Sequence, residues 1–247
     1  MRTLDSARAV VTGAGRGIGR AIAVRLAASG ASLAVVDADL GGEVVPEVAA
    51  QGVDVMGLRC DVTDPAAVDA SIGAVVDAWG GVDVLVCNAG GGTGPIHGNR
   101  ASEVDLGELE AVLRLNLYGT IHCCRAVAGP MRAQGRGSIV TMSSINGLAP
   151  TADGGYAHYG VAKAAVAQYT RYLARDLRPH GIRVNSVAPG PIGTARLRAR
   201  YAEAGEDLDA AGEPCDVAGV VEFLAGPAAR HVTGQVLTVD GGLLGHA

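Results

Sequence analysis

Short apolar segments alternate along this chain with longer segments that have the length and composition of helices. Apolar runs of about four to eight residues are expected to form buried β-strands. Helices between them are typical of right-handed β–α–β crossovers, which build a parallel sheet covered by helices on both faces. The expected strands are Ala9–Thr12, Ser32–Asp37, Val53–Cys60, Val82–Cys87, Ser138–Ser143, Ile182–Ala188 and Val236–Asp240, and the clearest helices are Gly17–Ser29, Pro65–Trp79 and Tyr156–Leu177.

The length and composition of the chain suit one such sheet. Its 247 residues match one large α/β domain or two small ones. Apolar residues make up 49% and aromatic residues only 3%, so the core is expected to be aliphatic, as in strands buried on both faces. Because no linker or repeat divides the sequence, we expect one Rossmann-type, doubly wound α/β domain over residues 1–247.

Residues 194–212 depart from the strand–helix pattern. The stretch is rich in Ala, Gly, Glu, Asp and Arg and poor in large apolar residues. Such an excursion from the core is a candidate substrate lid. Arg196, Arg198 and Arg200 lie within it, and their alternate spacing does not place all three on one face of a helix.

Charge and cysteine content narrow the class of protein. The net charge is −5 and Lys/Arg runs are absent from the sequence, which disfavours a nucleic-acid partner. The sequence shows neither a signal-peptide core nor an apolar run of ~18 residues, so we expect no membrane partner. The five cysteines are Cys60, Cys87, Cys123, Cys124 and Cys215. Their odd number and the lack of a CxxC pair favour reduced thiols and therefore a cytoplasmic location. We also expect no metal site.

A glycine-rich segment follows the first expected strand and opens a helix. It reads Thr-Gly-Ala-Gly-Arg-Gly-Ile-Gly over residues 12–19. Glycines let the backbone turn sharply and approach a pyrophosphate, and the helix N-terminus offers free N–H groups. Asp37 ends the next strand, where a carboxylate can accept both ribose hydroxyls of NAD and repel the 2′-phosphate of NADP. The alternatives are an ordinary tight turn and a helix-capping Asp37, and Arg16 is a contrary cue because a base there can serve a 2′-phosphate.

Four motifs in this order resemble the classical short-chain dehydrogenase/reductase family over Val10–Gly242. The resemblance implies a seven-stranded, mostly parallel sheet in the order 3-2-1-4-5-6-7, a nicotinamide cofactor and a homotetramer. It rests on the glycine segment 12–19, Asn88-Ala89-Gly90, Tyr159-x-x-x-Lys163 and Pro189-Gly190.

Tyr159 and Lys163 lie four residues apart, which places both side chains on one face of the expected helix. A free tyrosine has a pKa near 10, and a neighbouring lysine cation favours the phenolate. The resemblance implies that Tyr159 donates and accepts the proton and that Lys163 also holds the nicotinamide ribose. We set Tyr156 aside, because Gly160 stands four residues after it.

Two further residues complete the set that the resemblance implies to be catalytic. Ser144 matches the serine that hydrogen-bonds the substrate oxygen and steadies the developing oxyanion, with Ser143 as the alternative. Asn116 matches the residue that holds a water linked to Lys163. The alternative role for Asn116 is to kink or cap a helix. The alternative for either serine is a hydroxyl at the end of a strand that hydrogen-bonds its own backbone.

The resemblance also implies a set of cofactor contacts. Asp61 and Val62 match the pair beside the adenine, and small residues after the fourth strand let the backbone pass under the ribose. The residues expected to bind the cofactor are Gly13, Gly15, Arg16, Gly17, Ile18, Gly19, Asp37, Asp61, Val62, Asn88, Ala89, Gly90, Tyr159, Lys163, Pro189, Gly190, Ile192 and Thr194.

These residues favour an NAD-dependent oxidoreductase that interconverts a secondary alcohol and a ketone. The alternative is an NADPH-dependent 3-oxoacyl-(acyl-carrier-protein) or polyketide ketoreductase. Asp37 disfavours it, and so does His180, which stands where those reductases resemble one another in an arginine. A non-catalytic nucleotide sensor on the same fold is disfavoured, because it needs neither Ser144 nor Tyr159.

Overall fold

The computed structural model describes residues 3–95, 97–205, 207–208 and 211–245. Within them, seven strands form one sheet in the order β3-β2-β1-β4-β5-β6-β7. Every neighbouring pair is parallel, which confirms the expected fold class and strand order. The strands are β1 (Arg8–Thr12), β2 (Ser32–Asp37), β3 (Val55–Arg59), β4 (Val84–Cys87), β5 (Gly137–Met142), β6 (Ile182–Pro189) and β7 (Val236–Val239).

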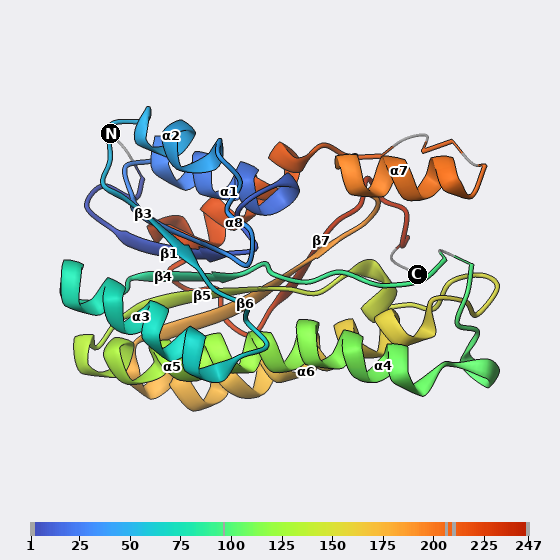
Figure 1. Ribbon diagram of the computed structural model, residues 1–247. Helices are drawn as coiled ribbons and strands as arrows, with labels where there is room; N and C mark the ends of the chain where they lie inside the picture. The colour runs from blue at the N-terminus through green and yellow to red at the C-terminus, as the bar shows by residue number, and fades with distance from the viewer. Residues whose placement is uncertain (1–2, 96, 206, 209–210, 246–247) are drawn as a thin grey trace.

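Helices cover both faces of the sheet (Figure 1). One face carries α1, α2 and α8, and the other carries α3, α5 and α6, with α4 at the end of that layer. The helix α7 lies apart from both layers, beyond the carboxyl ends of the strands. The bounds are α1 (Gly17–Ala28), α2 (Val44–Ala49), α3 (Pro65–Trp79), α4 (Leu106–Leu113), α5 (Gly119–Gln134), α6 (Ala157–Leu177), α7 (Ala195–Glu203) and α8 (Pro214–Ala225).

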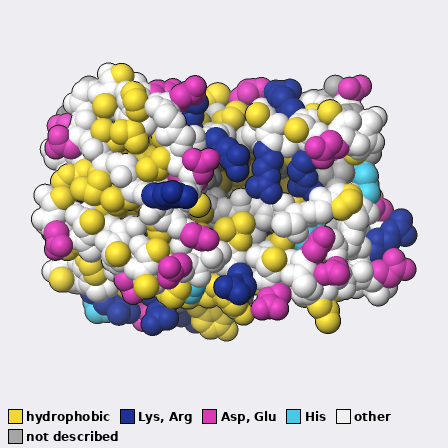
Figure 2. All heavy atoms as spheres, in the orientation of Figure 1, with side chains coloured by type: hydrophobic (Ala, Val, Ile, Leu, Met, Phe, Trp, Pro, Cys, Tyr) yellow, Lys and Arg dark blue, Asp and Glu magenta, His cyan; other side chains and the backbone are white. Residues whose placement is uncertain are grey.

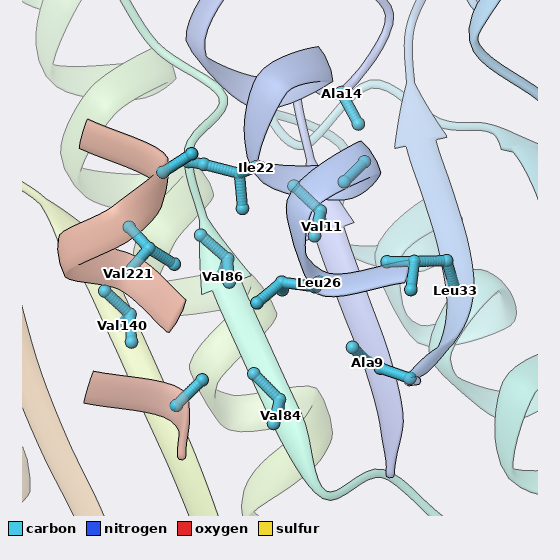
Figure 3. Close-up of a cluster of buried hydrophobic side chains, with 14 of the residues drawn as sticks. Ala9, Val11, Ala14, Ile22, Leu26, Leu33, Val84, Val86, Val140 and Val221 are labelled. Carbon is cyan, nitrogen blue, oxygen red and sulfur yellow. The ribbon is translucent and has the colours of Figure 1, made fainter. Parts of the chain in front are cut away.

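Each face of the sheet has its own aliphatic core. Figure 3 shows the core beneath α1 and α8, where Ile22 and Val221 pack over Val86. Successive strand residues point to opposite faces, so Val11 belongs to this cluster and Val10 to the cluster on the other face. Burial on both faces explains why the strands appear in the sequence as continuous apolar runs.

Three elements begin later than the sequence suggested, among them β3, which begins at Val55 and not at Val53. The helix α6 begins at Ala157, because Tyr156 has a left-handed backbone conformation with φ of 57°. The strand β4 begins at Val84, not Val82, because Asp83 turns its carboxylate to Arg8 instead of continuing a buried apolar run. The differences at α6 and β4 arise from polar or strained residues at the ends of these elements, which an apolar pattern does not register.

Asp83 ties together the amino ends of three strands. Its carboxylate accepts hydrogen bonds from Arg8 Nε at 2.6 Å and Nη2 at 2.9 Å, and from Arg136 Nε at 3.1 Å. Its backbone accepts from Ser138, at the start of β5. Although burial opposes ionisation, the hydrogen bonds and charge of Arg8 and Arg136 hold the pKa of Asp83 below its usual value.

We expect Asp83→Ala to lower the free energy of unfolding by about 2–4 kcal/mol, because it leaves the partly buried Arg8 without its counter-ion. A depressed pKa also means that the stabilisation is present above the ordinary aspartate pKa and is lost as the pH falls through the lower native value. Urea unfolding at several pH values measures both effects. The control is Glu43→Ala in an exposed ion pair with Arg20, expected to cost less than about 1 kcal/mol, and equal losses would contradict the assignment.

Candidate active site

The glycine segment forms a tight loop between β1 and α1. Gly13 and Gly17 have positive φ values of 63° and 56°. A Cβ on Gly13 would lie 2.7 Å from Ala89 Cα, and one on Gly19 would collide with the carbonyl oxygen of Gly13. The backbone therefore approaches its neighbours more closely than any side chain would permit, as a loop that cradles a pyrophosphate requires.

The N-terminus of α1 points into the same region. Among the described residues, no side chain caps this helix, so the N–H groups of its first turn remain available to an anion. Thr194 lies against the start of the helix, where a Cβ on Gly17 would stand 3.2 Å from Thr194 Cγ2. The loop, the helix end and Thr194 together fit the phosphate-bearing middle of a dinucleotide.

Asp37 lies beside this loop. Its Oδ2 accepts a hydrogen bond from Gly15 N at 2.8 Å, and its Oδ1 accepts one from Asp39 N at 3.0 Å. The structure also places a base nearby that the sequence analysis missed: Arg59 Nε donates to Ala38 O at 3.1 Å. The register of β2 and β3 pairs Asp37 with Arg59. This proximity could have been predicted only once the order of the strands in the sheet was known.

Hydrogen bonds fix the end of β4 to the glycine loop. Asn88 Nδ2 donates to the carbonyl oxygens of Thr12 and Gly13, at 3.0 and 2.9 Å. The Thr12 hydroxyl in turn accepts from the backbone N–H groups of Asn88 and Ala89, at 3.1 Å each. The sequence analysis singled out Asn88 and Ala89 but not the side chain of Thr12, which holds both in place.

The remaining predicted cofactor residues flank this centre. Asp61 is exposed and accepts from Thr63 N, and Val62 is buried against Gly119 at the start of α5. After β6, Gly190 N donates to Val239 O at 2.9 Å, and Ile192 is buried. These residues follow the carboxyl ends of β3 and β6, at the same edge of the sheet as the glycine loop.

The two candidate serines point in different directions. Ser143 is buried, and its hydroxyl donates to Lys163 O at 2.9 Å, a contact that fixes β5 to α6. The Ser144 hydroxyl lies beside the Tyr159 side chain and lowers the pKa of its phenol. It also donates weakly to Pro189 O at 3.5 Å. The structure therefore brings Ser144, not Ser143, to the tyrosine hydroxyl.

Burial sets the protonation of Tyr159 and Lys163. Removal from water raises the pKa of Tyr159 to about 12, against the opposing effects of the neighbouring Ser144 hydroxyl and the charges of Arg196 and Arg200. Lys163 is 4% exposed, its Nζ lies 5.6 Å from the Tyr159 ring centroid, and burial lowers its pKa to about 8. The sequence analysis looked only to Lys163 as a cation near Tyr159 and missed Arg196 and Arg200.

Asn116 lies in a π-helical turn, Arg114–Tyr118, between α4 and α5. Such turns distort a helix locally and are frequent at functional sites. Its side chain accepts from Gly91 N at 3.0 Å and donates to Gly91 O at 2.8 Å. A Cβ on Gly90 would lie 2.6 Å from Asn116 Oδ1 and 3.2 Å from Lys163 Nζ, so only glycine lets these two side chains converge there.

Tyr156 belongs to the surroundings of the site, although the sequence analysis set it aside. Its ring centroid lies 5.0 Å from that of Tyr159, and its hydroxyl accepts a hydrogen bond from Arg200 on α7. The helix α7 lies in the predicted lid 194–212, of which residues 206, 209 and 210 lie outside the described residues. Tyr156 thus connects α7 to the helix that carries Tyr159.

The described residues show neither a metal site nor a membrane-spanning helix. No group of three or more His, Cys, Asp or Glu side chains there is arranged to hold a metal ion. No helix in the same residues is long and apolar enough to cross a membrane.

Known proteins resemble this chain along nearly its whole length. The family model described as "Enoyl-(Acyl carrier protein) reductase" matches residues 13–244. Cyclohexanol dehydrogenase from Rhodococcus sp. (strain TK6) is 47% identical, covering 95% of each chain. The 3-oxoacyl-[acyl-carrier-protein] reductase from Synechocystis sp. (strain ATCC 27184 / PCC 6803 / Kazusa) is 37% identical, covering 99% of each.

A solved structure repeats the fold with a cofactor bound. The 7α-hydroxysteroid dehydrogenase complexed with NADH and 7-oxo glycochenodeoxycholic acid has a TM-score of 0.86 and 35% identity, covering 97% of this chain and 94% of its own. With such relatives, the protein is an oxidoreductase that acts on CH–OH groups with a nicotinamide cofactor. The chain belongs to the short-chain dehydrogenase/reductase family.

Proposed function

We propose that this protein interconverts a secondary alcohol and a ketone with NAD(H), using Tyr159 as the acid–base residue. The observation that carries the proposal is the convergence of three groups at the carboxyl ends of β5 and β6. Ser144 lies beside the Tyr159 side chain and lowers its pKa, and the buried Lys163 Nζ lies 5.6 Å from the centre of the tyrosine ring. Cyclohexanol dehydrogenase, the 47% identical relative, supports a secondary alcohol as the substrate class.

Each of these residues has a distinct task in the proposed reaction. The nicotinamide supplies the hydride acceptor or donor when it is bound. The Ser144 hydroxyl donates a hydrogen bond to the substrate oxygen and steadies the charge that develops on it. Tyr159 takes the hydroxyl proton during oxidation and returns it during reduction. Lys163 holds a positive charge beside the tyrosine, and the contact of Asn116 with Gly91 positions the neighbouring backbone.

Asp37 supports NAD(H) as the cofactor. Gly15 N and Asp39 N hold its carboxylate in a fixed orientation beside the glycine loop, where the adenosine ribose of a bound dinucleotide would lie. A fixed carboxylate can accept the two ribose hydroxyls, whereas a 2′-phosphate would meet a like charge. The remaining expected cofactor contacts, from Asp61 to Thr194, lie at the same edge of the sheet.

An NADPH-dependent 3-oxoacyl-(acyl-carrier-protein) reductase is the second candidate. Two observations favour it: Arg59 lies beside Ala38, and Arg16 is exposed in the glycine loop. The 37% identical reductase from Synechocystis shares the whole length of the chain. We place it second, because Asp37 accepts a hydrogen bond from Gly15 N in the loop, where its carboxylate would face a 2′-phosphate directly.

Replacing Tyr159 by Phe removes one hydroxyl and keeps the ring. We expect kcat for cyclohexanol oxidation to fall at least ~10²-fold, because the proton acceptor is lost, while folding and NADH binding persist. Stopped-flow absorbance at the NADH band measures turnover and NADH binding, and circular dichroism measures folding. Full activity in Tyr159→Phe would overturn the proposed mechanism.

The control is Tyr172→Phe on the same helix, where the tyrosine is 70% exposed, and its kcat should match wild type.

The pH profile of the reaction provides a second check on the role of Tyr159. Because burial raises the pKa of Tyr159 to about 12, the phenol is protonated at neutral pH. Phenolate is the accepting form, so oxidation should accelerate as the pH rises, whereas reduction needs the phenol and should not. An oxidation rate that falls with pH would contradict this role.

Asp37 provides a test of cofactor choice. We expect wild type to prefer NADH over NADPH by at least ~10-fold in kcat/KM, and Asp37→Ala to reduce that ratio about tenfold by removing the like charge. Steady-state reduction of cyclohexanone with each cofactor measures the ratio. Asp39→Ala, two residues further on, is the matched control. A wild-type preference for NADPH would favour the second candidate.

We also propose a cytoplasmic homotetramer. Large apolar or aromatic side chains are exposed on the helical layer of α5 and α6 and after β7: Tyr118, Val161, Tyr172 and Leu243. Burying such side chains between subunits would remove them from water. All five cysteines lie in the described part of the chain as free thiols, which supports a reducing compartment. Sedimentation velocity should give about four chain masses, and a stable monomer would contradict the assembly.

A further inference from the structure

The lid helix α7 directs two of its three arginines toward the site. Arg196 Nη2 donates to Gly92 O at 2.7 Å, and Arg200 Nη2 donates to Gly94 O at 2.6 Å. The two residues are four apart, so they share one face of the helix. Figure 2 shows basic side chains along the hollow beneath α7. The sequence analysis was right that all three arginines do not share a face, but two of them do.

The third arginine of the helix is engaged elsewhere. Arg198 forms an ion pair with Glu213 at 3.2 Å and donates to Gly193 O. Arg196 and Arg200, in contrast, form no ion pair with any carboxylate among the described residues; their acceptors are two backbone carbonyls and the Tyr156 hydroxyl. Neutral acceptors orient a guanidinium but leave its charge and several of its five N–H donors uncompensated.

Both guanidinium groups lie close to the proposed reacting groups. A Cβ on Gly91 would lie 2.5 Å from Arg196 Nη1, and Gly91 itself is held by Asn116. The Arg200 guanidinium lies 4.9 Å from the centre of the Tyr156 ring, which in turn contacts the Tyr159 ring. Their charges lower the pKa of Tyr159, which shows that both are electrostatically coupled to its hydroxyl. A substrate whose oxygen reaches Tyr159 would therefore extend its other end toward these arginines.

We infer that Arg196 and Arg200 together bind a carboxylate on the substrate, so that the protein acts on hydroxy acids and keto acids whose carboxylate lies several bonds from the reacting carbon. This inference rests on the proposed function and adds the substrate class to it. Two planar guanidinium forks match the geometry of one carboxylate, and the contacts with Gly92 and Gly94 orient them before the substrate arrives.

The test compares two ketones of one shape, cyclohexanone and 4-oxocyclohexane-1-carboxylate, with NADH in excess. The variants are Arg196→Met, Arg200→Met and, as the matched control on the same helix, Arg198→Met. We expect wild type to favour the carboxylate by about tenfold or more in kcat/KM, because each charge-assisted hydrogen bond adds affinity. Arg196→Met and Arg200→Met should each reduce this ratio about tenfold, whereas Arg198→Met should leave it at the wild-type value.

A binding measurement separates this inference from the proposed function. Isothermal titration of the enzyme–NADH complex with cyclohexanecarboxylate should show binding, and Arg196→Met and Arg200→Met should each weaken it. Cyclohexanecarboxamide should bind the wild-type complex at least tenfold more weakly than the carboxylate does. Carboxylate binding of this kind without turnover of either ketone would sustain the arginine site and overturn the proposed function.

Turnover of cyclohexanone without any preference for the carboxylate would do the reverse. Equal losses of the ratio in all three arginine variants would also overturn the inference, because they would indicate that α7 merely needs its helix charges to fold against the body of the protein.

Discussion

The site depends on the junction between β1 and β4, where the order of the strands reverses. The two strands are hydrogen-bonded in parallel, but the chain reaches β4 only after passing through β2 and β3 on the far side of β1. Loops that leave β1 and β4 in opposite directions open a crevice between them. Thr12 and Asn88 close the base of this crevice through their mutual hydrogen bonds. The positions of the glycine loop and the residues after β4 follow from that contact.

Burial gives the site its chemistry but also opposes it. The same removal from water raises the pKa of Tyr159 to about 12 and lowers that of Lys163 to about 8, so each group is driven toward its neutral form. A phenolate therefore needs positive charge close to it. The chain provides this charge from two directions: Lys163 from within α6, and Arg196 and Arg200 from α7, outside the body of the domain. The pKa of Tyr159 therefore depends on charges carried by α7, outside the body of the domain.

The sequence predicts an element best where local chemistry and packing agree. The bounds of α3 were predicted correctly, because Asp64 caps its first turn, Pro65 begins it and Gly80 ends it in a left-handed conformation. The strand β2 was predicted equally well, since its apolar run ends at Asp37. The sequence contains no local signal for the left-handed conformation of Tyr156. The choice between Ser143 and Ser144 depends on the direction in which each side chain points at the end of β5. Arg59 lies beside Asp37 only because β2 and β3, which are separate in sequence, pair in this register.

The cofactor side and the substrate side of the crevice are built by different means, and this difference explains what sequence patterns reveal. On the proposed cofactor side, glycine backbone and short side chains would make the contacts, so residue identity alone indicates the geometry. On the substrate side, Arg196 and Arg200 reach across from a separate helix to the carbonyls of Gly92 and Gly94. Their direction depends on where α7 docks, which no local spacing encodes. Substitutions on α7 could therefore change the substrate while the dinucleotide cradle and the fold remain as they are, because few contacts of the core pass through that helix.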